Sequence, residues 1–432
     1  MAKRSVSNTP PRRIAKRIVI LLDGTWQTDK GDKPPTNVVR LRDLIKPKND
    51  ENDKTEFIQH IYYDSGVGTG GPTTRRSWDG ITGNGLEDIV RGAYRQLCHR
   101  YEEGMEIYVF GFSRGAFSAR SLVGYLNAAG LLRAEHCSAV QEKKAWEFYR
   151  KPPRFRIPAE KRDMAKLCWP TTPKVKCLGV FDTVGARGIP LTRLRRRNAE
   201  RYGFHDTSLS SIVDHAFHAL ALDEKRRHYV PTLWSYAFHH NNKGIEQVWF
   251  PGCHSDIGGG VSSEDLSSLP LYWMIRRIQD NHLGLVLDDK GVEKVAAMRK
   301  ESEAILGNKG LIYKVLSMPP AHREVSQTRP NESGGLFVGL PRHWKPMREA
   351  VHWSVLKRIN GGTGYQPPNI FHDTFWPSVF EDGTPTDTDI VGEDERFLEW
   401  WRREDDYRAM LKILPEEQIA EFEKNVLKQK EW

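Results

Sequence analysis

The chain has 432 residues, of which 38% are hydrophobic and 10% aromatic, so it can bury the core of one large domain or of two ordinary ones. Its formal net charge of +9 favours anionic partners, but the sequence carries no zinc-finger, helix-turn-helix or aromatic RNA-binding motif, which argues against nucleic acid. No stretch approaches the roughly 18 uncharged apolar residues of a membrane span, and the N-terminus lacks the apolar core of a secretory signal. The five cysteines are an odd number without a CxxC pair, which is typical of a reducing compartment. We therefore expect a cytoplasmic protein, unless a dedicated secretion system exports it.

A basic tail of residues 1–17 comes first, and short apolar runs then alternate with helix-like segments. The runs mix β-branched and aromatic residues without strict alternation, which is typical of strands buried on both faces. We predict strands at 18–23, 57–63, 106–112, 175–182 and 247–252, and helices at 86–101, 116–126 and 212–222. Strands that alternate with helices predict an α/β fold, in which a mostly parallel sheet has helices on both faces.

Two stretches, 131–170 and 184–245, are long for connections between neighbouring strands. We predict that they are helical cap insertions in a core that spans 18–285. After this core the pattern loosens, and residues 286–432 are expected to form a helical and loop extension packed on it.

The pentapeptide GFSRG at 111–115 lies between the predicted strand 106–112 and a predicted helix. It matches the G-x-S-x-G nucleophile elbow of α/β-hydrolases, where a sharp strand-to-helix turn presents a serine hydroxyl at the top of the sheet. Small residues are needed at Gly111 and Gly115, because side chains there would collide with neighbouring elements. Ser113 is therefore the candidate nucleophile. The alternative is that its side chain only caps the helix.

A serine nucleophile needs a base and an acid that orients the base, and in an α/β-hydrolase these follow in the order serine, acid, histidine. Asp182 ends the apolar run CLGVFD, and His254 follows the run VWFPGC. We predict them as acid and base, although each could also be a simple turn or loop residue. The backbone N–H groups of Arg114 and of Gly24 or Thr25 are the candidate donors to an oxyanion.

Two sets of residues could instead bind a metal ion. His215 and His218 lie three apart in a predicted helix, but no carboxylate completes that set, and satisfied core histidines are the favoured interpretation. Asp23, His254 and Asp256 could surround a divalent ion, as in a metal-dependent phosphoesterase. That reading leaves the serine elbow unexplained.

Three further features are weaker candidates. GVGTGG at 66–71 fits a dinucleotide-binding glycine pattern, but loop-like residues follow it where a helix would have to begin. His352 is a second candidate for the base. Asp256 is a second candidate for the orienting acid, disfavoured because His254 already occupies that strand end.

A family resemblance is carried by six segments in a fixed order: LLDGTWQ, YYDSGVGTGG, FGFSRGAFSARSLVGYL, GVFDTVGARGIP, HALALDEKRRHYVPTLW and QVWFPGCHSDIGGG. They resemble the type VI secretion phospholipase-effector-like α/β-hydrolase family over about residues 17–278, with a weaker echo at 350–369. The resemblance implies a hydrolase of acyl esters, glycerophospholipids among them. Ser113, Asp182 and His254 match its nucleophile, acid and base.

We therefore predict a serine hydrolase that cleaves acyl esters, with phospholipids as the expected substrates and no metal or organic cofactor. Peripheral contact with an anionic membrane is a further expectation, because basic runs at 193–197 and 225–227 lie in the second insertion. These runs could equally be solvated helix faces. The alternative function is a catalytically silent interaction or immunity module that keeps the hydrolase fold.

Overall fold

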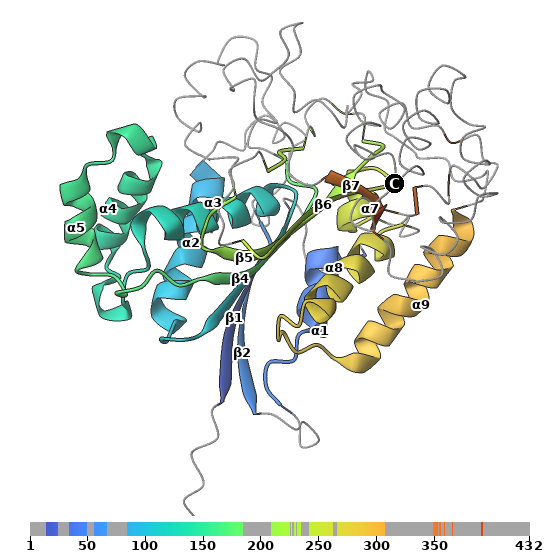
Figure 1. Cartoon of the computed structure of the whole chain (residues 1–432), viewed down its shortest axis with the longest axis horizontal. Coiled ribbons are helices and arrows are strands. Elements are labelled where there is room, and N and C mark those ends of the chain that lie inside the picture. Colours follow the sequence, from blue (N-terminus) through green and yellow to red (C-terminus); the bar gives the residue numbers. More distant parts are fainter. Residues whose placement is uncertain are drawn as a thin grey trace, which may run out of the picture.

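The computed structural model describes residues 14–24, 34–49, 56–66, 84–184, 209–224, 226, 229, 231–234, 242–261, 266–306, 349–352, 354, 355, 358, 365, 390 and 391. They form a central sheet with helices on both sides (Figure 1). The described strands are β1 Ala15–Leu22, β2 Phe57–Asp64, β3 Glu106–Phe112, β4 Val175–Phe181, β5 Val213–Ala221, β6 Gly244–Phe250, β7 Glu349–His352 and β8 Ile390–Val391. The described helices are α1 Asn37–Leu44, α2 Asn84–Arg100, α3 Arg114–Ala129, α4 Ala139–Arg150, α5 Pro158–Ala165, α7 His254–Gly258, α8 Ser268–Asp280 and α9 Asp289–Ile305.

The strands lie in the order β2-β1-β3-β4-β5-β6-β7-β8, and every described pair is parallel. The chain passes from β1 to β2 on one side of β1 and then to β3 on its other side. The strand order therefore reverses between β1 and β3. In open parallel sheets, ligands bind at such a reversal, outside the carboxyl ends of the strands. The topology thus directs attention to the residues just after Leu22 and Phe112.

β1 shows why the apolar runs fold as strands of a two-sided sheet. Residues 18–22 are at most 1% exposed. Ile18 and Ile20 belong to a core that includes α2 and α3, whereas Val19 and Leu21 belong to a core that includes α1 and α8. Successive side chains of a strand point to opposite faces, so a run buried on both faces is apolar throughout. The predicted α/β fold, a parallel sheet covered on both faces, is confirmed.

The segment 212–222 is a strand and not the predicted helix. It forms β5, which pairs with β4 on one side and β6 on the other. The range 184–245, predicted as an insertion, therefore contributes a strand to the sheet. The predicted extension 286–432 also contributes, since β7 pairs with β6 and β8 pairs with β7 at the end of the sheet. The prediction of three separate parts otherwise stays untested.

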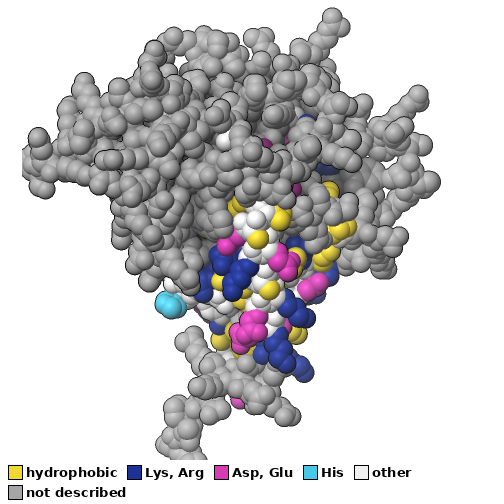
Figure 2. Space-filling view, turned by 90° about the vertical axis from the view of Figure 1, so that its right-hand side faces the viewer, with side chains coloured by type: hydrophobic (Ala, Val, Ile, Leu, Met, Phe, Trp, Pro, Cys, Tyr) yellow, Lys and Arg dark blue, Asp and Glu magenta, His cyan; other side chains and the backbone are white. Residues whose placement is uncertain are grey.

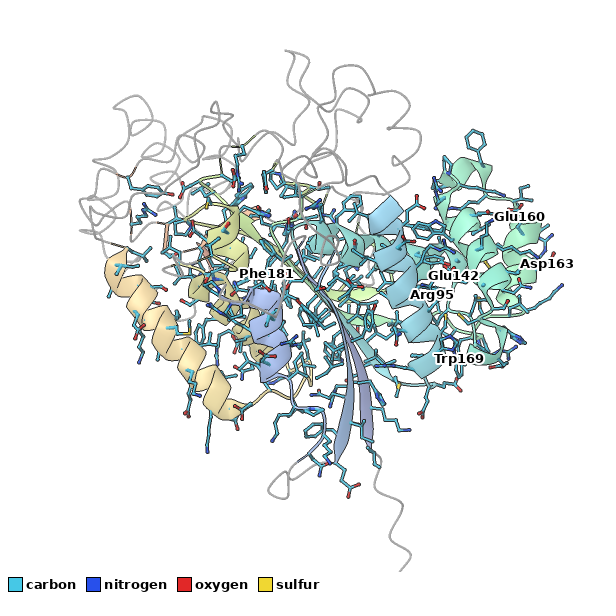
Figure 3. The ribbon with its side chains drawn as sticks, turned by 180° about the vertical axis from the view of Figure 1, so that it is seen from behind. Arg95, Glu142, Glu160, Asp163, Trp169 and Phe181 are labelled. Atoms are coloured by element: carbon cyan, nitrogen blue, oxygen red, sulfur yellow. The ribbon has the colours of Figure 1, made fainter. Side chains whose placement is uncertain are left out.

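Residues 131–170 contain helices α4 and α5, which lie against α3, with α4 also contacting α2 (Figure 1). The buried carboxylate of Glu142 on α4 accepts three hydrogen bonds from Arg91 of α2, at 2.6 to 3.1 Å. Arg95 lies 3.7 Å from the same carboxylate (Figure 3). Tyr125 of α3 donates to the Glu142 backbone carbonyl at 3.1 Å. The Arg91–Glu142 ion pair and the Tyr125 hydrogen bond thus attach α4 to α2 and α3.

The opposite side of the molecule is seen in Figure 2. On its described part, Lys, Arg, Asp and Glu side chains lie among hydrophobic ones, a mixture typical of a solvated surface. Among the described helices, none combines the length and the apolar character that crossing a membrane requires.

Candidate active site

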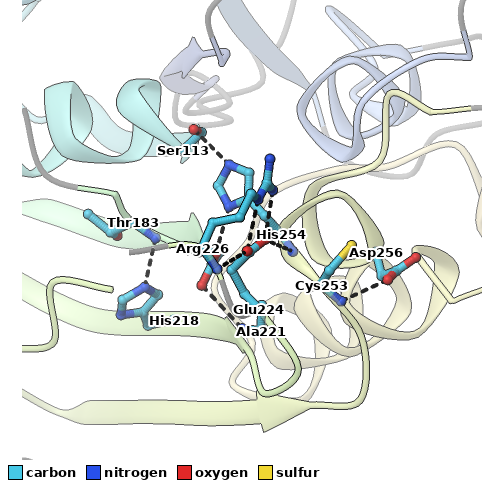
Figure 4. A network of polar contacts seen from close by, with 10 residues as sticks. Ser113, Thr183, His218, Ala221, Glu224, Arg226, Cys253, His254 and Asp256 are labelled. Atoms are coloured by element: carbon cyan, nitrogen blue, oxygen red, sulfur yellow. Dashed lines mark hydrogen bonds and ion pairs between the residues drawn. The ribbon is translucent and has the colours of Figure 1, made fainter. Parts of the chain in front are cut away.

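Four consecutive strands of the sheet each have a polar residue just past their carboxyl ends. These residues are Ser113 after β3, Asp182 after β4, Glu224 after β5 and His254 after β6. The four strands are parallel neighbours, so their carboxyl ends meet at one edge of the sheet. Figure 4 shows how closely the side chains gather there.

Ser113 occupies a strained backbone conformation, with φ of 57° and ψ of −121°. Its N–H donates to the Phe181 carbonyl of β4 at 3.0 Å, which holds the turn against the neighbouring strand. Two glycines make the turn possible. A Cβ at Gly111 would lie 2.6 Å from the carbonyl oxygen of Gly115, and a Cβ at Gly115 would lie 2.1 Å from that of Leu22. The turn is the sharp strand-to-helix elbow that the motif predicts.

The Ser113 hydroxyl makes no capping hydrogen bond to the described first turn of α3, which argues against the helix-cap alternative. Its Oγ lies 2.8 Å from Nε2 of His254, and Nδ1 of His254 lies 2.6 Å from Oδ2 of Asp182. A carboxylate can only accept, so Nδ1 carries the proton and Nε2 accepts from the serine. The other oxygen of the fully buried Asp182 accepts from the N–H of Ala221 at 3.1 Å. Three residues predicted at separate strand ends thus form one hydrogen-bonded series.

His254 is the first residue of α7 and is held from several sides. Its ring contacts the rings of Phe112 and Tyr229, at 4.7 and 4.8 Å between centroids. The carboxylate of Asp256 accepts from the N–H of Cys253 at 2.7 Å and so stabilises the start of the helix. Asp256 therefore caps α7, whereas the carboxylate that contacts the imidazole is Asp182.

Glu224 is a site residue that the sequence analysis missed. Its side chain is fully buried, and one carboxylate oxygen accepts from the backbone N–H of His254 at 3.2 Å. The same carboxylate accepts two side-chain hydrogen bonds from Arg226, at 2.8 and 2.7 Å. The Arg226 guanidinium in turn lies 3.7 Å above the ring of Tyr229. The signal that could have found it is the stretch DEKRRHY, in which Glu224 stands next to several basic residues. A carboxylate that is buried needs such partners of opposite charge.

The predicted oxyanion donors follow β1 and β3, the two strands between which the strand order reverses. Arg114 is the first residue of α3, so its N–H needs no partner within the helix. Gly24 lies close to Ser113, since a Cβ there would lie 3.4 Å from Cβ of Ser113. The Gly24 N–H, however, donates to Oδ1 of Asp23 at 2.7 Å and is thereby engaged. Thr25 lies outside the described residues.

Asp23 fixes the end of β1 behind this position. Its carboxylate accepts from the hydroxyl of Thr36 at 2.6 Å and from that of Tyr63 at 2.9 Å, in addition to the Gly24 N–H. Burial raises the pKa of Asp23 to about 6, against these hydrogen bonds, which lower it. The carboxylate thus ties β1 to α1 and β2.

The two histidines of β5 do not form a metal pair. In a strand, residues three apart point to opposite faces, so the helical spacing assumed for His215 and His218 does not apply. His218 is buried and neutral: its Nε2 accepts from the N–H of Thr183 at 3.2 Å, and its Nδ1 donates to Oε1 of Gln247 at 3.3 Å. It therefore positions the loop that follows Asp182, as a satisfied core histidine.

His352 lies on β7, where its Nδ1 is 2.7 Å from Oγ of Ser354 and its ring stacks on Phe250 at 4.3 Å. It is His254, and not His352, that lies within hydrogen-bond distance of Ser113. In the part of the chain that the structure describes, no group of three His, Cys, Asp or Glu side chains is placed to hold a metal ion. The glycine-rich stretch 66–71 lies outside the described residues beyond Gly66.

Comparisons with known proteins identify the family of the chain. Residues 16–277 match the family described as "T6SS, Phospholipase effector Tle1-like, catalytic domain". The uncharacterized protein YEL023C of Saccharomyces cerevisiae is 30% identical over 266 residues, which are 54% of this chain and 36% of the yeast protein. The chain thus spans about a third of the length of that relative.

Solved structures show more distant likenesses. An uncharacterized protein from Pseudomonas aeruginosa has 17% identity and a TM-score of 0.43, over 70% of this chain and 55% of that one. The Tle1 effector bound to the VgrG spike of the type 6 secretion system has 20% identity and a TM-score of 0.34, over 61% and 56%. The esterase Est2 of Thermogutta terrifontis has 13% identity and a TM-score of 0.29, over 64% and 86%. Since the family match covers more than half of the chain, the protein belongs to the Tle1-like phospholipase effector family of type VI secretion systems, in its catalytic domain.

Proposed function

We propose that this protein is a serine hydrolase that cleaves carboxylic acyl esters, with phospholipids as its substrates, through an acyl-enzyme on Ser113. The observation that carries the proposal is the series Asp182–His254–Ser113, with contacts of 2.6 and 2.8 Å at the carboxyl ends of neighbouring strands. Membership of a phospholipase-effector family supports an ester-cleaving hydrolase of the lipase or esterase type.

The proposed reaction begins when Nε2 of His254 takes the hydroxyl proton of Ser113 as Oγ attacks the ester carbonyl carbon. Asp182 holds the imidazole in the required tautomer and stabilises the imidazolium that forms. The tetrahedral intermediate then expels the alcohol, which receives the proton from His254. Water, deprotonated by His254, then attacks the acyl-enzyme carbonyl; the second tetrahedral intermediate expels Oγ of Ser113, which takes the proton back from His254, and the fatty acid leaves.

The negative oxygen of the tetrahedral intermediate needs donors beside Ser113. We assign the N–H of Arg114, at the positive end of the α3 dipole, as the first donor. Because the Gly24 N–H already donates to Asp23, the N–H of Thr25 is the second donor in this proposal.

Phospholipids are proposed as substrates from the family match and from the net charge of +9, which favours approach to anionic bilayers. Peripheral contact with an anionic membrane is part of the same proposal. Binding to a secretion spike is a property of the Tle1 effector and carries over only as a hypothesis.

Labelling with a fluorophosphonate probe tests the mechanism, because such probes react with activated serines. The wild-type protein is expected to label, and Ser113→Ala is expected to abolish labelling while the protein stays folded by circular dichroism. A panel of phospholipids analysed by product mass spectrometry then tests the substrate class. A folded wild-type protein that resists the probe and cleaves no ester, with or without detergent, would instead support the silent interaction module.

A further inference from the structure

Asp223 follows β5 and binds the loop that leads from β6 to His254. Its backbone N–H donates to the Gly252 carbonyl at 2.9 Å, and its Oδ2 accepts from the Gly252 N–H at 2.7 Å. Gly252 has a φ of 124°, and a Cβ there would lie 2.5 Å from Cβ of Asp256, so the turn before α7 requires glycine. Asp223 thus holds both polar backbone groups of a residue two positions before the predicted base.

The other oxygen of the same carboxylate binds a residue from far along the chain. Oδ1 of Asp223 accepts from the hydroxyl of Tyr365 at 2.6 Å, a contact between residues 142 positions apart. Tyr365 lies beyond residue 277, where the match to the catalytic domain of the family ends. The buried guanidinium of Arg358 lies 4.2 Å from the centroid of the Tyr365 ring. A part of the C-terminal segment is therefore joined, through one carboxylate, to the loop that precedes His254.

The surroundings of Asp223 make the hydrogen bond from Tyr365 a strong one. Burial raises the pKa of Asp223 to about 6, against the Tyr365 hydroxyl, the Gly252 N–H and the charge of Arg358, which lower it. The carboxylate is therefore ionised at neutral pH, and a hydrogen bond to an ionised acceptor is stronger than one between neutral groups. Loss of the Tyr365 hydroxyl would leave a charged oxygen without this donor in a place with little water.

We propose that Tyr365 is a positioning residue that acts on His254 through Asp223. The inference rests on the proposed function and extends its site beyond the catalytic-domain match. The hydroxyl holds the carboxylate in the rotamer whose second oxygen binds the Gly252 N–H. His254 is the first residue of α7, so a shift of the preceding loop moves Nε2 away from its 2.8 Å contact with Oγ of Ser113. Reaction rates are sensitive to such small displacements.

The test is a double-mutant cycle in the whole chain, with kcat and KM measured for p-nitrophenyl butyrate. Tyr365→Phe removes only the hydroxyl, so kcat is expected to fall about 3- to 10-fold while KM stays within about twofold of the wild type. Asp223→Ala should lower kcat about 10- to 100-fold. Because Tyr365 acts through that carboxylate, adding Tyr365→Phe to Asp223→Ala should cause no further loss.

A conservative variant separates position from charge. In Asp223→Asn the amide oxygen can accept from the Gly252 N–H while the amide N–H donates to the Tyr365 hydroxyl, so kcat should stay within about threefold of the wild type. If Asp223→Ala does not fold, Asp223→Asn replaces it in the cycle. The loss caused by Tyr365→Phe should then be smaller than in the wild-type background, because the charged acceptor is gone.

Tyr94→Phe is the matched control, because it removes a tyrosine hydroxyl at the opposite end of α3 from Ser113. That hydroxyl donates to the Gly130 carbonyl at 2.9 Å. The control should lose stability in urea unfolding but keep the wild-type kcat. An unchanged kcat in Tyr365→Phe, or an equal loss from it with and without Asp223→Ala, would overturn the inference while the esterase stands. If the wild type hydrolyses no ester and resists the fluorophosphonate, the proposed function fails and this inference fails with it.

Discussion

The buried carboxylate of Glu224 accepts a 3.2 Å hydrogen bond from the backbone N–H of His254, so the position of the imidazole depends on a residue 30 positions earlier. Glu224 also neutralises Arg226, whose guanidinium covers Tyr229, and Tyr229 packs on the His254 ring. One carboxylate thus supports the histidine through its backbone and, indirectly, through its ring.

Replacing Glu224 is expected to reduce both activity and stability. In Glu224→Ala the α7 N-terminus loses its acceptor and Arg226 its counter-charge, so kcat for p-nitrophenyl butyrate should fall about 10- to 100-fold. The free energy of unfolding should fall by about 2 kcal/mol, less than for a fully buried pair because Arg226 is partly exposed. Glu142→Ala, a buried glutamate paired with Arg91 outside the proposed site, is the control: it should lose stability but retain kcat while folded. Wild-type kcat in Glu224→Ala would contradict this role.

Asp182→Asn is expected to lower kcat by about 10³- to 10⁴-fold without unfolding the protein. The amide of the asparagine would donate to Nδ1 of His254, which places the ring proton on Nε2 and prevents that atom from accepting the Ser113 proton. Ester hydrolysis and the rate of fluorophosphonate labelling measure the loss. Asp214→Asn, a buried carboxylate on β5 that pairs with Lys243 at 2.9 Å, serves as control and should keep its kcat. Similar losses in both variants would show that the effect is one of general folding.

The strained turn at Ser113 should be measurable as lost stability. Positive φ costs a non-glycine residue on the order of 1 to 3 kcal/mol, whereas glycine adopts it freely but loses more chain entropy on folding. We therefore expect Ser113→Gly to be about 1 kcal/mol more stable than Ser113→Ala in urea unfolding, with both variants inactive. Equal midpoints for the two variants would remove the case for strain.

The glycine at 115 is expected to tolerate no side chain. In Gly115→Ala the new methyl group would lie 2.1 Å from a carbonyl oxygen of β1, which cannot move without disturbing the sheet, so a loss of more than about 3 kcal/mol is expected. Gly124→Ala lies on the same helix, where the nearest atom is the Tyr149 hydroxyl at 3.2 Å. This control should stay within about 1 kcal/mol of the wild type, since alanine also favours the helix. Equal denaturation midpoints for the two variants would contradict the prediction.

The raised pKa of Asp23 predicts a specific pH dependence. Between about pH 4 and about pH 6 the folded carboxyl keeps a proton that the unfolded chain has released, so this residue makes stability fall as pH rises through that window. The stability of Asp23→Asn relative to wild type should therefore increase from about pH 4 to about pH 6 and then level off. Urea titrations across this range measure the difference. Asp163→Asn, at an exposed position, should show no such trend.

The sequence predicted the positions of site residues well where a recognisable motif lies at the end of a predicted strand. The five predicted strands are all present, and Ser113, Asp182 and His254 lie within hydrogen-bond distance as their order suggested. The elbow is easily predicted because sterics demand glycine at two fixed positions. The catalytic roles of the three residues stay predictions until the variants are tested.

The segment 212–222 could not be assigned correctly for a physical reason. Its apolar residues are spaced as on a helix face, and its alanines favour helix. β5 is buried on both faces, so the alternation that marks a half-exposed strand is missing. The importance of Glu224 was also hidden, because its partner His254 is distant in sequence and its neighbours suggested a solvated basic run.

The arrangement of the strands has a consequence for how this protein can be divided. A break in the chain between β4 and β5 would leave Ser113 and Asp182 on one fragment, and His254 with Glu224 on the other. Under the proposed mechanism neither fragment alone hydrolyses an ester, and recovery of turnover on mixing would report that β4 and β5 had paired. The protein is therefore suited to a split reporter, in which the rate of ester hydrolysis measures the association of the two fragments.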